Sequence, residues 1–167
     1  MVDAKFGQWR AAPRRIAGLV RTAWPKRVLV AEACLALALA EARLKLFPLK
    51  RQGLKGLAPA AESAPAERPE AGLAERQAAF DIGWAVGRVA ARFPTSAMCL
   101  AQALAARTML RRRGVASRLH VGVGRSKEAP FEAHAWLEAA GVEVTGYPVP
   151  AHFREIGVLA ADGAASR

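Results

Sequence analysis

Apolar residues recur at helical spacing in three stretches of the first two thirds of the chain. The first stretch, 25–47, is rich in Ala and Leu, and Pro48 discourages its continuation. The second covers 71–92 and the third 97–113, where Gly114 suits the end of a helix. The pattern therefore predicts three helices.

After Gly114 the period changes from helical to alternating. Alternation of apolar and polar positions is found at 119–124, 131–138 and 142–145, and it is typical of half-buried strands. The residues around His152 show poor periodicity, so we predict no element there. Helices followed by strands indicate an α+β domain with a small antiparallel sheet of at least three strands.

Residues 58–70 separate the first helix from the rest of the chain. They include three prolines and little that could be buried, which predicts a linker or mobile loop. We accordingly divide the chain into a basic N-terminal helical region (1–57), this linker, and a core (71–167). The total of 167 residues matches one compact domain.

Composition and charge narrow the function classes. With 53 % hydrophobic and 23 % charged residues, the chain is not a disordered one, and two cysteines exclude a disulfide-rich scaffold. The net charge of +11 points to an acidic partner, such as a nucleic acid, an anionic membrane or an acidic peptide. The arginines are scattered without an aromatic-interleaved stripe, so we expect no nucleic-acid partner, and nucleic-acid binding is kept as the weaker alternative.

The most apolar stretch, 28–42, is interrupted by Glu32 and Glu41. It is shorter than the ~20 apolar residues that a membrane span needs, and no secretory signal is evident. We therefore expect a cytoplasmic protein without a membrane span. A helix lying at a membrane surface, helped by the basic residues before it, is the alternative.

A cysteine and a histidine carry the candidate chemistry. Cys99 lies in the first turn of the third predicted helix, where free backbone N–H groups stabilise a thiolate or an oxyanion. Cys34 lies in an apolar helix and is best explained as a core residue. A base must come from His120, His134 or His152, and a lone cysteine–histidine pair is by itself a weak signal.

Other site types have less support. The cysteines and histidines lack the close pairs of a zinc site, and no phosphate-binding loop is present, so we predict no metal and no cofactor. Arg111, Arg112 and Arg113 crowd the last turn of the third helix, where cations suit the helix dipole. We interpret them as a solvated helix end.

The stretch that begins at Cys99 closely resembles the B2-type leader peptidases of lasso peptide biosynthesis, a transglutaminase-like family. The resemblance rests on Cys-Leu at the helix start, Leu-Arg-Arg-Arg-Gly at its end, the Val-Gly-Val strand and the Phe-Glu-Ala-His-Ala-Trp-Leu-Glu block at 131–138. It covers 94–145, and more loosely the helix at 24–47.

This resemblance implies a papain/transglutaminase-like core with the nucleophile at a helix N-terminus. The protein would be a cysteine peptidase that removes the leader from a precursor peptide, with Cys99 as nucleophile and His134 as general base. Its implied partners are a separate leader-binding recognition protein and an ATP-dependent lasso cyclase. A transglutaminase-like acyltransferase with the same dyad is the closest alternative.

The chain departs from the family at the third catalytic position. The family places an aspartate about twelve residues after the histidine; here Gly146 stands there, and no aspartate occurs between positions 82 and 161. A two-residue turn at 140–141 would place Tyr147 opposite His134 and Thr145 diagonally from it. The third member is therefore left open between Thr145, Asp162, a backbone carbonyl and a bare dyad.

Overall fold

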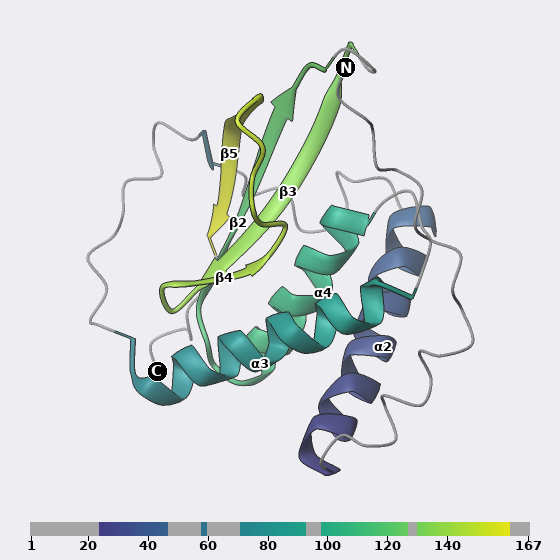
Figure 1. Ribbon diagram of the computed structural model, residues 1–167, viewed down its shortest axis with the longest axis vertical. Helices are drawn as coiled ribbons and strands as arrows, with labels where there is room; N and C mark the ends of the chain where they lie inside the picture. Colours follow the sequence, from purple (N-terminus) through teal and green to yellow (C-terminus); the bar gives the residue numbers. More distant parts are fainter. Residues whose placement is uncertain (1–23, 47–57, 60–70, 93–97, 127–129, 161–167) are drawn as a thin grey trace, which may run out of the picture.

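The computed structural model describes residues 24–46, 58–59, 71–92, 98–126 and 130–160, and it contains three helices followed by a sheet (Figure 1). The helices are α2 (Trp24–Leu46), α3 (Leu73–Ala90) and α4 (Met98–Arg112). The strands are β1 (Ala58–Pro59), β2 (Ser117–Gly124), β3 (Glu132–Ala139), β4 (Val142–Thr145) and β5 (Phe153–Ala160). The α+β class and the three helices predicted from the sequence are confirmed.

The sheet is antiparallel, with the order β1-β5-β2-β3-β4. Strand β5 pairs with residues 118–124 of β2, although no strand was predicted there from the sequence. The pairing between β2 and β5 shifts register between Val121 and Gly122, so a strict alternation is not kept along β5. This irregularity explains why the periodicity of that segment was too poor to predict a strand.

Strand β1 involves the first residues of the expected linker. Ala58 and Pro59 pair with Val158 and Gly157 of β5 and form one edge of the sheet. The expected linker at 58–70 thus begins with two residues that belong to the sheet, and 60–70 lie outside the described residues.

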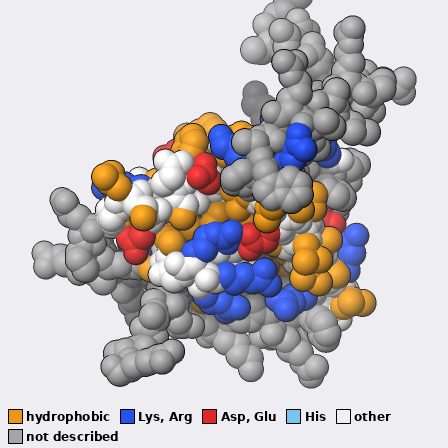
Figure 2. Space-filling model, turned by 90° about the horizontal axis from the view of Figure 1, so that it is seen from below, with side chains coloured by type: hydrophobic (Ala, Val, Ile, Leu, Met, Phe, Trp, Pro, Cys, Tyr) orange, Lys and Arg blue, Asp and Glu red, His pale blue; other side chains and the backbone are white. Residues whose placement is uncertain are grey.

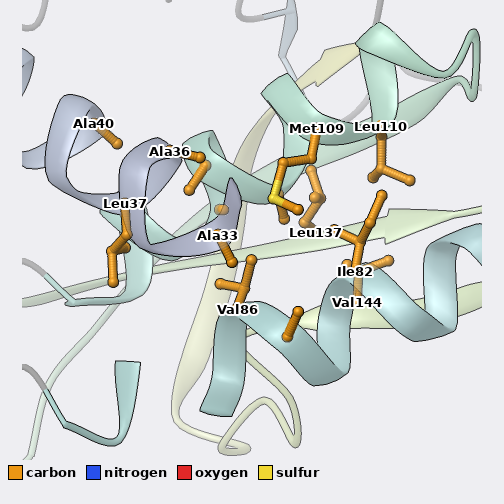
Figure 3. Close-up of a cluster of buried hydrophobic side chains, with 14 of the residues drawn as sticks. Ala33, Ala36, Leu37, Ala40, Ile82, Val86, Met109, Leu110, Leu137 and Val144 are labelled. Carbon is orange, nitrogen blue, oxygen red and sulfur yellow. The ribbon is translucent and has the colours of Figure 1, made fainter. Parts of the chain in front are cut away.

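The hydrophobic core lies between the helices and one face of the sheet (Figure 3). Helix α2 packs against α3 and α4, so the N-terminal helix shares its core with the residues after 71. In α3 the residues Ala79, Ile82, Val86 and Val89, which recur at helical spacing, are buried. Core side chains from all these elements include Leu37, Ile82, Val86, Met109, Leu110, Leu137 and Val144.

The end of α4 is exposed, in line with the interpretation of its arginine cluster, and an ion pair also joins it to α2. Arg113 donates hydrogen bonds from Nη2 to Glu32 Oε2 (2.6 Å) and from Nη1 to Glu32 Oε1 (3.1 Å). Arg112 lies 3.6 Å from the same carboxylate. The hydrogen bond from Arg113 lowers the pKa of Glu32. Arg113 also donates to the carbonyl of Met109, as expected for a cation at a helix C-terminus.

None of the helices in the described part of the chain combines the length and hydropathy needed to cross a membrane.

Candidate active site

Cys99 is the second residue of α4 and is half-buried. Helix α4 packs against β3 and leads through the short connection 113–116 into β2. Figure 1 shows α4 running in the opposite direction to β2, so its first turn is directed toward the end of the sheet where β3 begins. The first four backbone N–H groups of a helix have no acceptor within the helix, so those of this turn can stabilise negative charge at or near the sulfur.

His134 is the third residue of β3 and is half-buried. Its Nε2 lies 2.7 Å from the carbonyl oxygen of Gly146. A carbonyl can only accept, so Nε2 carries the proton and donates it to this hydrogen bond. In the neutral ring the other nitrogen, Nδ1, is therefore unprotonated and is the atom available to act as a base.

The carbonyl of Gly146 reaches His134 because the register between β3 and β4 is not the simple one. The pairing shifts between Leu137 and Glu138, so Thr145 pairs with Leu137. The expected register, with Tyr147 opposite His134, is wrong by one residue, because a bulge cannot be inferred from the turn alone.

Gly146 has a backbone conformation that favours glycine, with φ of +82°. A Cβ atom at this position would contact the carbonyl oxygen of Ala135 and lie 2.8 Å from Cα of Trp136. Both the dihedral angle and the space around it therefore exclude a side chain. The family's aspartate position is occupied here by a residue that presents its backbone carbonyl to the histidine.

The two side chains named as possible third members are placed differently. Thr145 is buried beside the core, and in the part of the chain that the structure describes its Oγ1 has no hydrogen-bond partner. It pairs with Leu137, a core residue that lies on the opposite face of β3 from His134. Asp162 lies outside the described residues.

Aromatic rings hold the His134 ring on the face of the sheet away from the helices. Trp136 stacks on His134 with ring centroids 5.9 Å apart, and Phe153 of β5 lies 5.1 Å away. Gly122 is the residue opposite His134 on β2, and a Cβ there would lie 2.8 Å from the Trp136 ring. The position of the Trp136 ring therefore depends on the absence of a side chain at Gly122 on the neighbouring strand. The contribution of Phe153 could not be foreseen because β5 was not predicted.

Behind Trp136 lies a second histidine, His120, whose side chain is buried. Its ring stacks on Trp136 with centroids 5.5 Å apart and an interplanar angle of 3°. Its two nitrogens lie 3.3 Å from Glu155 and 3.5 Å from Glu138, so the protonated ring would form ion pairs with both carboxylates. His120, Trp136 and His134 thus form one continuous stack.

Acidic residues also affect Tyr147, which follows Gly146. Burial raises the pKa of Tyr147 to about 12, and the negative charges of Glu138, Glu143 and Glu155 add to the shift. The phenol therefore stays protonated under physiological conditions and cannot serve as a base.

The third histidine, His152, lies at the rim of this region. Its Nε2 is 3.3 Å from Glu132 Oε2, and Ser126 donates a hydrogen bond of 2.5 Å to the other oxygen of Glu132. The hydrogen bond from Ser126 is the main reason why the pKa of Glu132 is lowered. His152 also packs against Phe153, with centroids 4.3 Å apart.

The structure places Cys99 on the helix that packs against the His134 strand, while the His134 ring is on the other face of that strand. In the described residues no hydrogen bond joins Cys99 to His134. A contact between the two side chains is therefore proposed below and is not observed in the structure. No group of three or more His, Cys, Asp or Glu side chains in the described ranges is arranged to hold a metal ion.

A protein-family model matches most of the chain. Residues 44–158 match the family model described as the Transglutaminase-like superfamily, a span that runs from the end of α2 into β5. This span includes Cys99, His134 and Gly146. No curated protein and no solved structure matches the chain.

Proposed function

The chain belongs to the transglutaminase-like superfamily, and on this premise we propose that it is a cysteine peptidase that removes the leader from a lasso precursor peptide. The superfamily supports cysteine-dependent hydrolase or acyltransferase chemistry in general. The finer assignment rests on the resemblance of the Cys99 helix and the 131–138 block to B2-type leader peptidases.

The observation that carries the proposal is the hydrogen bond from His134 Nε2–H to the carbonyl of Gly146. A catalytic imidazole must keep one nitrogen unprotonated and directed at the nucleophile. The carbonyl fixes which nitrogen holds the proton, and Trp136 and Phe153 restrict the tilt of the ring. We propose that this carbonyl replaces the aspartate of the family, in preference to Thr145 or Asp162.

The proposed reaction requires Cys99 and His134 to meet at the end of the sheet where β3 begins, because the ring otherwise lies on the face of β3 away from α4. There Nδ1 of His134 takes the thiol proton of Cys99 and the sulfur attacks the scissile carbonyl carbon. The oxyanion of the tetrahedral intermediate lies at the backbone N–H groups of the first turn of α4. The C–N bond then breaks, His134 returns the proton to the leaving amine, and the core peptide departs with a free N-terminus. Water, deprotonated by His134, hydrolyses the thioester and releases the leader with a free carboxylate.

A backbone carbonyl stabilises the charged form of the catalytic histidine differently from a carboxylate. It fixes the tautomer of neutral His134 but carries no charge, so it stabilises the imidazolium less than an aspartate would. The thiolate of Cys99 is then the main counter-charge for protonated His134. We therefore propose a dyad oriented by the main chain.

The proposed partners are the precursor peptide, a separate leader-binding recognition protein and the ATP-dependent cyclase. The net charge of +11 favours electrostatic attraction to acidic segments of such partners. Leader cleavage at subsaturating substrate should then slow as salt rises, because exposed charges are screened over ~10 Å at 0.1 M.

The test is to incubate the protein with its neighbouring precursor and recognition protein and to analyse the products by mass spectrometry. Leader and core fragments whose masses sum to the precursor plus one water are the expected result. Condensation of the precursor with an added amine would instead identify an acyltransferase. Cys99→Ala is the control for both outcomes, and intact precursor with the active parent protein would reject the proposal.

A further inference from the structure

Helix α2 carries an exposed apolar surface, which we call the outer stripe. It consists of Val28, Leu35, Leu39 and Leu46, whose exposed fractions are 53, 58, 45 and 73 %. The spacings of seven, four and seven residues place these side chains on one face of the helix. Three exposed alanines lie between them, and these are Ala31, Ala38 and Ala42.

The opposite face of α2 is already buried in the core of the protein. Val30, Ala33, Leu37 and Ala40 contact the other helices there. A helix that is apolar on two opposite faces is typical of one that is covered on both sides. Large contiguous apolar surfaces on soluble proteins commonly mark interaction sites.

The borders of the outer stripe are basic. Lys26 and Arg27 precede it, and Arg43 and Lys45 lie near its end; all four side chains are exposed. The same helix has two acidic residues, Glu32 and Glu41: Glu32 is engaged by Arg113, and Glu41 is half-buried.

At the end of the molecule where α2 begins, the basic surface continues onto other elements. Arg111 and Arg112 at the end of α4 are exposed, and Arg112 lies beside Glu32 of α2. Arg88 of α3 and Lys26 both lie over the Trp84 ring. Figure 2 shows Lys and Arg side chains gathered next to hydrophobic ones on the face seen from below.

We propose that the outer stripe is the docking site for an amphipathic helix of a partner protein, with aliphatic residues on its apolar face and Asp or Glu along its borders. The regular spacing of the stripe fits a helix lying alongside α2. The basic borders supply the complementary charge. A second copy of this chain fits less well, because it would bring the same basic borders together. A lipid surface fits less well because the stripe lacks the Trp and Phe that anchor interfacial helices.

The probe is a pair of synthetic, fluorescently labelled helical peptides with the same Leu/Ala face. One has Glu along both borders and the other has Lys. We expect the Glu-bordered peptide to bind the full chain, with an affinity that falls as salt rises, and the Lys-bordered peptide to bind at least about tenfold more weakly.

The matched variants change exposed leucines only. The double variant Leu35→Ser/Leu39→Ser should weaken binding of the Glu-bordered peptide by at least about tenfold, because two apolar contacts are lost. Leu73→Ser, at an 86 % exposed position on α3, should leave the affinity unchanged. Circular dichroism checks that both variants fold, and neither change touches Cys99 or His134, so this test is independent of the peptidase proposal.

Three outcomes would overturn the proposal. The first is absence of binding of the Glu-bordered peptide, or equal binding by parent and Leu35→Ser/Leu39→Ser. The second is a dimer, detected by light scattering, that the same double variant dissociates; the occupant would then be a second copy. The third is stripe-dependent binding to phosphatidylglycerol-containing vesicles with no preference for the Glu-bordered peptide, which would identify a lipid surface.

Discussion

Replacing Gly146 with alanine should destabilise the protein strongly, and the structure allows the effect to be estimated. A non-glycine residue in the left-handed region costs about 1–2 kcal/mol. The new Cβ would also press against the Ala135 carbonyl and the Trp136 backbone, and such overpacking typically costs about 1–3 kcal/mol. The sum of about 2–5 kcal/mol is a large part of the roughly 5–15 kcal/mol that stabilise a typical domain.

Urea unfolding followed by tryptophan fluorescence and circular dichroism measures this loss. With a slope of about 2 kcal/mol per molar urea, the midpoint should fall by about 1–2.5 M. Gly87→Ala is the matched control, because Gly87 is exposed in α3 and no atom lies within 4 Å of a Cβ there. That variant should gain roughly 0.5–1 kcal/mol, since alanine is the better helix former.

The same substitution tests the hydrogen bond to His134. If the Gly146 carbonyl holds the Nε2 proton, that proton should give a protected imidazole N–H signal in NMR spectra of the parent protein. The signal should be lost in any folded fraction of Gly146→Ala. A Gly146→Ala protein with the unfolding midpoint of Gly87→Ala and an unchanged His134 signal would refute the reasoning. Gly146→Asp, which would restore the family's acid, should fail for the same steric reason.

Three further predictions follow from other parts of the molecule. Cys99→Ala should reduce leader cleavage by on the order of 10³-fold or more, whereas Cys34→Ala should retain activity and lose ~1 kcal/mol of stability. Product masses measure the cleavage and urea midpoints measure the stability. A fully active Cys99→Ala protein would exclude the mechanism. Pairing with Arg113 lowers the pKa of Glu32 in the folded protein. The ion pair therefore stabilises the fold at pH values above the pKa that Glu32 has in the unfolded chain, and this stabilisation is lost as the pH falls through the folded-state pKa. Glu32→Gln should thus cost on the order of 1 kcal/mol or less at pH 7 and nothing at pH 2; an equal difference at both pH values would contradict this. Tyr147 is the chain's single tyrosine, so absorbance at 295 nm should show half-ionisation at about pH 12 in the folded protein and at pH ~10 in urea. Since the folded pKa is raised, stability should decline as pH rises above 10, and a folded midpoint near 10 would show that the phenol is not buried.

The elements that could be predicted from the sequence are those whose signal is local. The three helices and strands β2, β3 and β4 have clear periods of 3.6 or 2, and the structure places them within a few residues of the predicted bounds. Strand β5 was missed because its pairing with β2 shifts register, so its alternation is broken. The ion pair between Arg113 and Glu32 joins residues 81 positions apart, and no local pattern reveals such a contact.

The site shows the same division. Cys99 is predicted from its place at a helix start, whereas His134 is singled out among three histidines only by the family resemblance; the structure places the first in the first turn of α4 and the second on β3. The hydrogen bond from His134 to the Gly146 carbonyl depends on the bulge at Leu137/Glu138, which only the folded sheet shows. A glycine directly after a strand was nevertheless a usable signal, because it is the residue that adopts positive φ at such a point.

The position of β5 has a consequence for how the protein is made. It is the last described strand along the chain, but it lies between β1 and β2. During translation, one edge of β2 therefore stays unpaired while the ribosome extends the chain from residue 124 to residue 160, which takes roughly 2–7 s at typical synthesis rates. Unpaired strand edges are templates for aggregation, so this interval is the time at which the nascent chain most needs a chaperone. Phe153, which packs on the His134 ring, is part of this strand. The aromatic contacts of His134 can therefore form only after β5 has been synthesised.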